Sequence, residues 1–374
     1  MKGINKVSGM LSKLRVRPVW FGVFAIAVIV LFMTGTQSSF SVYVLDSVLL
    51  ACLGAIALNL LMGTAGQVSI GTSAFLLLGA FSSVFFIRSN IPLPAVIVLS
   101  VLVCGVGGLI FALPALRLRS LFFALSTLSA YFIAVFCGNQ YEDAVPGAGS
   151  GGFQINPVFP SVDLARSQQY WALLLAVLVI LLILVVSRLM RERSGRAWRI
   201  IREHEFIAPV LGVRVSRYKL IVFALSSMVM GLEGSLMAYF SGSVTTDEFT
   251  LQLSILYVAM VLVGGLDSRA GAVIGATILT ALPIELPQLL GHVLNPAQAA
   301  TDGPQYAIIV YGLLIIVFIC SSPRGVIGWL WSLRRSRVAS IIENWMPSLF
   351  SRGSTPDEAP AASAAEPSAP EIVP

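Results

Sequence analysis

Long apolar stretches dominate this chain, and each has the length of a membrane-spanning helix. Between Trp20 and Cys320 the polar residues are few, and they gather between the apolar stretches. A helix needs about 20 apolar residues to cross a bilayer, and about ten such stretches fit the chain. We therefore predict an all-α fold, a polytopic membrane helical bundle without a soluble domain. The predicted spans are residues 18–36, 42–63, 67–87, 94–113, 120–138, 169–188, 217–240, 252–266, 271–290 and 305–321.

One polar interruption is long and basic. It carries Arg188, Arg191, Arg193, Arg196, Arg199, Arg202, Arg214 and Arg217. Trp198, Ile201 and Ala208 follow helical spacing, and Gly212 provides a turn after them. A basic amphipathic helix lying on anionic lipid is one interpretation. Because acidic residues break the basic run, we favour a compact surface element at 189–216 that transmits a push from a soluble partner.

The charges of the connections predict the orientation. With the basic N-terminus, residues 1–17, in the cytoplasm, the inner connections collect most arginines and the outer ones most acidic residues. This agrees with the positive-inside rule for ten spans with both termini cytoplasmic, in the cytoplasmic (inner) cell membrane. The span at 252–266 is short, and a re-entrant segment is the alternative there. The first apolar run is interpreted as an uncleaved span rather than a signal peptide.

The composition of the chain predicts how its remaining segments are organised. Residues 18–321 form the transmembrane domain, with a turn-rich outer loop at 139–168. Residues 322–350 form a basic cytoplasmic C-terminal segment. The tail, residues 351–374, is rich in Pro, Ala, Ser and Glu, and we expect it to be disordered.

Composition narrows the class of protein. The chain is 57% hydrophobic and 11% charged, with a mean hydropathy of +0.88, whereas soluble domains carry about 25% charge. The net charge of +6 belongs to arginines beside the spans, so we expect no nucleic-acid partner. The four cysteines lie in apolar stretches without a CxxC pair, and the two histidines are too few for a metal or catalytic cluster. No phosphate-binding Gly-rich loop is present, and we expect no cofactor and no metal.

The segment from residue 59 to 71 interrupts the helical pattern. It combines Asn59, Gly63, Gly66, Gln67, Ser69 and Gly71 between two apolar runs. Non-helical backbone at membrane depth persists only where protein or water satisfies its polar groups, and broken helices often line a substrate path. A tight cytoplasmic turn between two spans is the alternative interpretation.

Glu233 lies well inside the predicted span 217–240. A carboxylate there costs on the order of 3 kcal/mol, so it usually faces a cavity or a partner. The alternative is a hydrogen-bonded carboxyl that fixes the packing of helices.

Three blocks together resemble the branched-chain amino acid ABC transporter permease family. The blocks are Leu58–Gly71, the loop from Gly195 to Leu220, and Val263–Ala276. Their order and separation are similar to those of the family, over about residues 40–325. The resemblance implies a permease subunit that pairs with a second permease subunit, two cytoplasmic ATP-binding subunits and an extracytoplasmic solute-binding protein.

The resemblance also implies roles for residues. ATPase coupling falls to Arg202, Glu203, His204, Glu205, Ala208 and Gly212, and the translocation path to Asn59, Gly63, Gly66, Gln67, Ser69 and Gly71. Glu233 is added to the path because a carboxylate inside a span is costly unless a cavity or protein receives it, although the family leads us to expect a small apolar residue there. The expected solute is a branched-chain or related hydrophobic amino acid, moved by alternating access, and the chain itself is not an enzyme. Urea, amides or another small solute are alternatives. A proton- or sodium-coupled secondary transporter that uses Glu233 is a rival from another class.

Overall fold

A computed structural model of the chain describes residues 39–115, 120–145, 148–149, 152–155, 164–266 and 268–291, together with the single residues 309, 312, 313 and 316. The predicted span 18–36, most of 305–321 and the terminal segments 1–17 and 322–374 lie outside this part. Each of the other eight predicted spans corresponds to a helix. The elements are α3 (Ser39–Asn59), η1 (Leu60–Thr64), α4 (Thr72–Arg88), α5 (Leu93–Ala115), α6 (Ser120–Ala144), β1 (Ala148–Gly149), β2 (Gly152–Gln154), α7 (Leu164–Leu189), α8 (Arg193–Glu203), α9 (Val215–Ser241), β3 (Ser243–Val244), η2 (Thr246–Glu248), α10 (Leu251–Gly264) and α11 (Arg269–Gly291).

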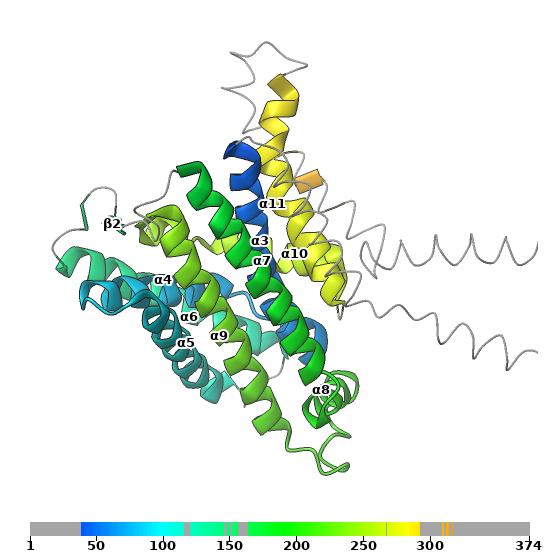
Figure 1. Cartoon of the computed structure of the whole chain (residues 1–374). Coiled ribbons are helices and arrows are strands. Elements are labelled where there is room, and N and C mark those ends of the chain that lie inside the picture. Colours follow the sequence, from blue (N-terminus) through cyan, green and yellow to red (C-terminus); the bar gives the residue numbers. More distant parts are fainter. Residues whose placement is uncertain are drawn as a thin grey trace, which may run out of the picture. The chain divides into compact units, whose positions relative to one another are not determined.

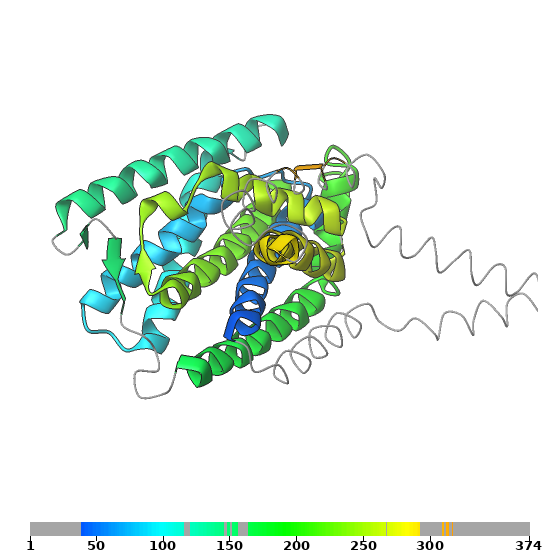
Figure 2. The same ribbon diagram turned by 90° about the horizontal axis from the view of Figure 1, so that it is seen from above.

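Helix α3 lies at the centre of the described bundle. It packs against α7, α9, α10 and α11, and Figures 1 and 2 show it, in blue, between these helices. In the most apolar part of α3 and η1, 94% of the residues are buried by protein, against 28% in α6. A helix that is apolar on all sides has to be covered by protein or lipid. Within the described residues, α3 is therefore covered by protein, and α6 leaves most of its surface to the surroundings.

Six of the described helices are long and apolar enough to cross a membrane. Helix α4 is shorter, because the chain stays non-helical until Gly71 although we predicted a span from residue 67. Glycines on both helices let α4 approach α9, since a Cβ on Gly79 would lie 2.4 Å from the carbonyl oxygen of Gly231. The crossing holds α4 against the middle of the bundle.

The predicted outer loop 139–168 is shorter than expected and partly regular. Helix α6 continues to Ala144, α7 begins at Leu164, and β1, β2 and β3 form an antiparallel sheet in which Phe153 pairs with Ala148 and Val244. The extension follows from tertiary contacts, because Tyr141 packs on Phe153 with ring centroids 5.4 Å apart. The predicted helical membrane fold is confirmed, and it carries one small sheet that was not predicted.

Candidate functional site

Helix α3 ends in a distorted turn, at the position of the predicted break. Leu60–Thr64 form one turn of π-helix, and the Thr64 hydroxyl donates to the carbonyl oxygen of Leu60. Hydroxyls that bond back to the preceding turn commonly bend a helix. Gly66 then takes a positive φ of 69°, which ends the helix.

The non-helical residues that follow are largely enclosed by protein. Gly63, Gln67, Ser69 and Gly71 are buried, and Gly66 is exposed. The Ile70 amide donates to the Thr127 hydroxyl of α6 at 3.1 Å, and the missing side chain of Gly71 admits the Thr127 carbonyl. Contacts with α6 thus satisfy part of this irregular backbone.

Asn59 attaches this turn to a segment that is 209 positions away in the sequence. Its Nδ2 donates to the carbonyl oxygen of Ser268 at 2.9 Å, in the connection between α10 and α11. Gln67 is different, because neither polar atom of its buried side chain has a partner among the described residues. A buried amide without partners is costly, so it marks a place where a polar ligand or water would be stabilised.

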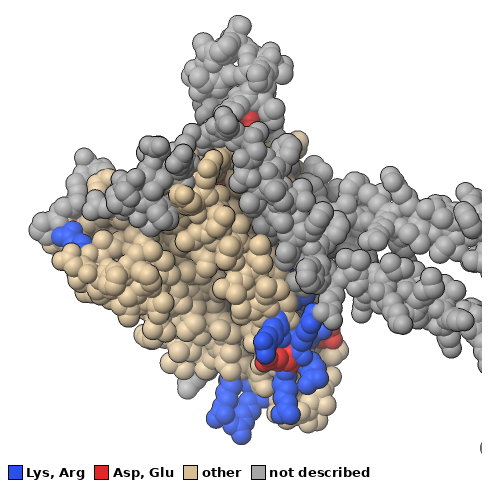
Figure 3. Space-filling view, in the orientation of Figure 1, with Lys and Arg blue, Asp and Glu red and all other residues tan. Residues whose placement is uncertain are grey.

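Helix α8 is the amphipathic element predicted in the basic loop. Trp198 and Ile201 are buried, whereas the arginines of the helix are exposed. The Trp198 indole N–H donates to the carbonyl oxygen of Tyr218 at 2.9 Å, which fixes α8 on the start of α9. Figure 3 shows the basic side chains gathered over this end of the bundle.

A single side chain joins α8 to the end of α3. The Arg202 guanidinium donates to the carbonyl oxygen of Gly63, and its Cγ lies 3.2 Å from where a Cβ on Gly66 would stand. Arg202 was predicted as a coupling residue, and Gly63 and Gly66 as path residues. The structure brings these two predicted sets into direct contact across 139 positions of sequence.

The chain after α8 forms a turn rather than the continued helix that the spacing indicated. Helix α8 stops at Glu203, because His204 takes non-helical angles of φ −145° and ψ 76°. Glu203 and His204 are exposed, Ala208 is buried, and Glu205 pairs with Lys219 at 2.5 Å. The pair and the buried alanine hold the turn against α9.

Gly212 closes this turn, as predicted. Its φ is +77°, its amide donates to the carbonyl oxygen of Pro209 at 3.0 Å, and a Cβ there would meet nothing within 4 Å. The requirement for glycine is therefore one of backbone conformation and not of space.

Sequence reasoning missed the apolar tip of the turn, which we define as Phe206, Val210 and Leu211. Phe206 is 91% exposed and Val210 83% exposed. The prediction for this loop rested on its charged residues and did not use the apolar residues between them. Large apolar side chains that gather on an exposed turn, next to basic ones, are typical of a surface that binds another protein or a membrane.

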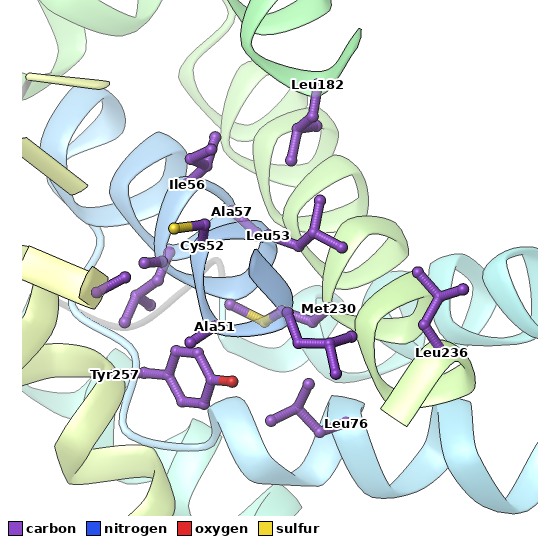
Figure 4. Close-up of a cluster of buried hydrophobic side chains, with 14 of the residues drawn as sticks. Ala51, Cys52, Leu53, Ile56, Ala57, Leu76, Leu182, Met230, Leu236 and Tyr257 are labelled. Atoms are coloured by element: carbon purple, nitrogen blue, oxygen red, sulfur yellow. The ribbon is translucent and has the colours of Figure 1, made fainter. Parts of the chain in front are cut away.

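Glu233 lies in α9 at the junction of three helices and is 1% exposed. The Tyr257 hydroxyl of α10 donates to its Oε1, and its Oε2 has no partner among the described residues. A Cβ on Gly54 of α3 would lie 2.0 Å from that Oε2, so only glycine leaves room for the carboxyl. Figure 4 shows Tyr257 near Met230 and Leu76, among the buried apolar side chains of the core.

The structure does not place Glu233 at the break. The Glu233 carboxyl lies beside Gly54 of α3. Nine residues separate Gly54 from Gly63 of η1, which corresponds to roughly 13 Å at 1.5 Å per residue. Asp46, which we had not selected, lies a similar distance further along α3, is fully buried, and has no partner for either carboxylate oxygen among the described residues. Its signal was visible in the sequence as one acid inside the predicted span 42–63. Three buried polar side chains, those of Asp46, Glu233 and Gln67, therefore lie at successive heights along α3 and the turn that follows it.

No group of three or more metal-ligating side chains occurs within the part of the chain that the structure describes. The buried polar side chains of Asp46, Glu233 and Gln67 are instead single groups, set apart by apolar side chains.

Several known proteins are similar in sequence to this chain. A family model described as "Branched-chain amino acid transport system / permease component" matches residues 40–319. The high-affinity branched-chain amino acid transport system permease protein LivM of Salmonella typhimurium is 26% identical over 297 residues, and the match covers 73% of this chain and 66% of that protein. LivM of Escherichia coli matches to the same extent. The autoinducer 2 import system permease protein LsrD of Photorhabdus laumondii is 25% identical over 299 residues, with coverage of 79% and 84%.

Proposed function

Because the chain belongs to the branched-chain amino acid transport permease family, we propose that it is the membrane-spanning permease subunit of an ATP-driven importer. Its partners are a second permease subunit, two cytoplasmic ATP-binding subunits and an extracytoplasmic solute-binding protein. The proposed solute is a branched-chain or related hydrophobic amino acid, after the names of the LivM relatives. The name of LsrD, an import permease for autoinducer 2, keeps other small solutes as the alternative.

The bond between Arg202 and Gly63 carries this proposal. It connects a helix on the basic surface directly to the distorted end of the most buried helix. A displacement of α8 by a partner then acts on the π-helical turn, which is one of the weaker points of a helix. In our proposal, closure of the ATP-binding subunits moves α8, and the α3 end moves with it as the permease alternates between its two openings.

The apolar tip and the exposed arginines of α8 form the proposed contact with an ATP-binding subunit. Phe206, Val210 and Leu211 project from a turn whose base is held by the buried Ala208 and by the pair between Glu205 and Lys219. A rigid base lets the tip transmit force instead of folding away. An apolar groove with an acidic rim on the partner would complement this surface.

The proposed route for the solute follows α3. Asn59, Gly63, Gly66, Gln67, Ser69 and Gly71 supply hydrogen-bonding groups at one end, and Glu233 lies further along the same helix. A solute with a polar head and an apolar tail would exchange hydrogen bonds with these groups, while the surrounding apolar side chains accept the tail. The orphaned polar atoms of Gln67 support this role, because a passing head group would satisfy them.

The orientation remains the one predicted from the charges, with both termini in the cytoplasm. Labelling by a membrane-impermeant thiol reagent tests it. From outside, the reagent should reach a cysteine placed at Ser150 and miss one at Ser336. The opposite pattern would place the apolar tip on the wrong side for an ATP-binding subunit.

Co-purification from native membranes tests the function itself. The full-length chain should bring down ATP-binding subunits, and Val210→Asp should release them, because it puts a charge into an apolar contact. Ser216→Asp is the matched control, since it adds the same charge at an exposed residue outside the tip and should leave the complex intact. Solute uptake by the chain alone, without ATP, would support the secondary transporter instead.

A further inference from the structure

A small cavity lies where α8 meets α3, α7 and α11, next to the bond between Arg202 and Gly63. It has a volume of about 50 Å³. Its polar lining consists of Arg199, Arg269, Asn59 and Thr64, and Val186 and Met190 belong to its apolar wall. At about 10–15 Å³ for each water-sized group, it holds roughly three to five such groups. That space suits one compact head group rather than a whole amino acid.

The charge of the lining selects an anion. Arg199 comes from α8 and Arg269 from the start of α11, so arginines from two separate elements line one cavity. Among the residues that the structure describes, no acidic side chain lines it. Guanidinium groups bind the oxygens of phosphate through paired hydrogen bonds. A zwitterionic amino acid fits less well, because its ammonium group would find no acidic partner here.

We propose that this cavity binds a phosphate group, held between Arg199 of α8 and Arg269 of α11 against the end of α3. The apolar wall favours the headgroup of an anionic phospholipid as the source. Val186 and Met190 belong to α7 and its end, and the neighbouring Leu184 and Val185 of α7 are exposed and apolar. These exposed residues lie on other sides of α7 than the cavity, and a lipid whose chains lie against α7 can place its phosphate in the cavity from the edge of the helix, as basic pockets between spans do for anionic lipids.

A bound phosphate would affect how firmly α8 is attached to the bundle. A phosphate bound there would bridge α8 and α11, one turn of helix away from Arg202, and so stiffen the attachment of α8 to the bundle. The proposal does not require the transporter assignment, since it rests on the cavity and its lining alone.

The test uses the full-length chain in lipid nanodiscs, with bound lipid counted by native mass spectrometry and Tm as the second readout. One sample contains phosphatidylcholine only, one contains added phosphatidylglycerol, and one contains phosphatidylcholine with inorganic phosphate in the buffer. We expect phosphatidylglycerol to be retained and to raise Tm. Arg199→Gln should weaken its binding about fivefold, as expected for one basic residue near a membrane surface.

Arg193→Gln is the matched control, because Arg193 lies exposed on the same helix and does not line the cavity. It should retain the lipid like the wild type. Arg269→Gln should match Arg199→Gln, and Arg199→Gln alone decides the test if the Arg269 variant does not fold. A Tm shift from inorganic phosphate that equals the lipid effect would identify free phosphate as the source. Equal losses in Arg199→Gln and Arg193→Gln, or no retention and no shift in any sample, would overturn the proposal.

Discussion

Two of the polar positions along α3, Glu233 and the turn at Gly63, differ in how they are connected to the rest of the molecule. Glu233 is buried between α3, α9 and α10, with Gly54 and Tyr257 against its carboxyl. The turn at Gly63 is instead tied by Arg202 to a helix on the basic surface. A buried polar group can therefore either fix the packing of a core or receive a signal from outside, and the partners decide which. Of these two places, the Gly63 turn is the one with a partner that reaches the surface.

The largest effect should come from filling the space beside Glu233. Gly54→Leu should lower stability by about 1–3 kcal/mol or more and prevent accumulation, because its side chain would overlap the carboxyl and the Tyr257 ring. Gly54→Ala should reduce Tm less, and Glu233→Ala should restore part of that loss in the double variant. Gly312→Ala is the control, since a Cβ there meets nothing within 4 Å. Additive losses in Gly54→Ala and Glu233→Ala would show that the two residues do not share one space.

A substitution in the turn after α8 should impair the surface connection without affecting the core. Gly212→Val should cost about 1–2 kcal/mol locally, because its φ of +77° disfavours side chains with a β-branch. ATP-dependent uptake should fall about tenfold, as that cost implies, while membrane insertion stays normal. Gly212→Asn is the matched control, because asparagine tolerates this conformation. Normal uptake by Gly212→Val would show that this turn does not take part in ATPase coupling.

The role of Glu233 in transport should be visible without a change in packing. Glu233→Gln keeps the shape and an acceptor for the Tyr257 hydroxyl. If the route follows α3 past this point, uptake should fall about fivefold, because a charge-assisted hydrogen bond is replaced by a neutral one at a cost of about 1 kcal/mol, with normal subunit assembly. Glu233→Leu removes the polar group altogether. Wild-type uptake by both variants would restrict the carboxyl to packing and leave the turn at 59–71 as the remaining candidate.

The smallest effect should come from the C-terminal tail. Deletion of residues 355–374 should leave uptake within about twofold, since a segment of this composition buries too little apolar surface to order itself. A large loss of uptake after this deletion would mean that the tail docks on a partner.

The sequence was sufficient for the eight spans that lie within the described residues, for the basic surface helix and for the break after α3, because local hydropathy, charge or glycine content indicates each of them. It was not sufficient for contacts between distant residues. The bond from Arg202 to Gly63 and the space that Gly54 leaves for Glu233 depend on helix packing, and nothing local indicates them. The short sheet at Phe153 was hidden for the same reason, since its strands are two or three residues long and are held by tertiary contacts.

The number of solute molecules imported per ATP hydrolysed tests the central claim most directly. It should be measured with Arg202→Ala in the reconstituted transporter, with Arg196→Ala, exposed on the same helix, as the control. Loss of a charge-assisted hydrogen bond is worth about 1.5–3 kcal/mol, so we predict that this ratio falls at least about tenfold in Arg202→Ala while ATP hydrolysis continues. A ratio in Arg202→Ala equal to that of Arg196→Ala would contradict the account.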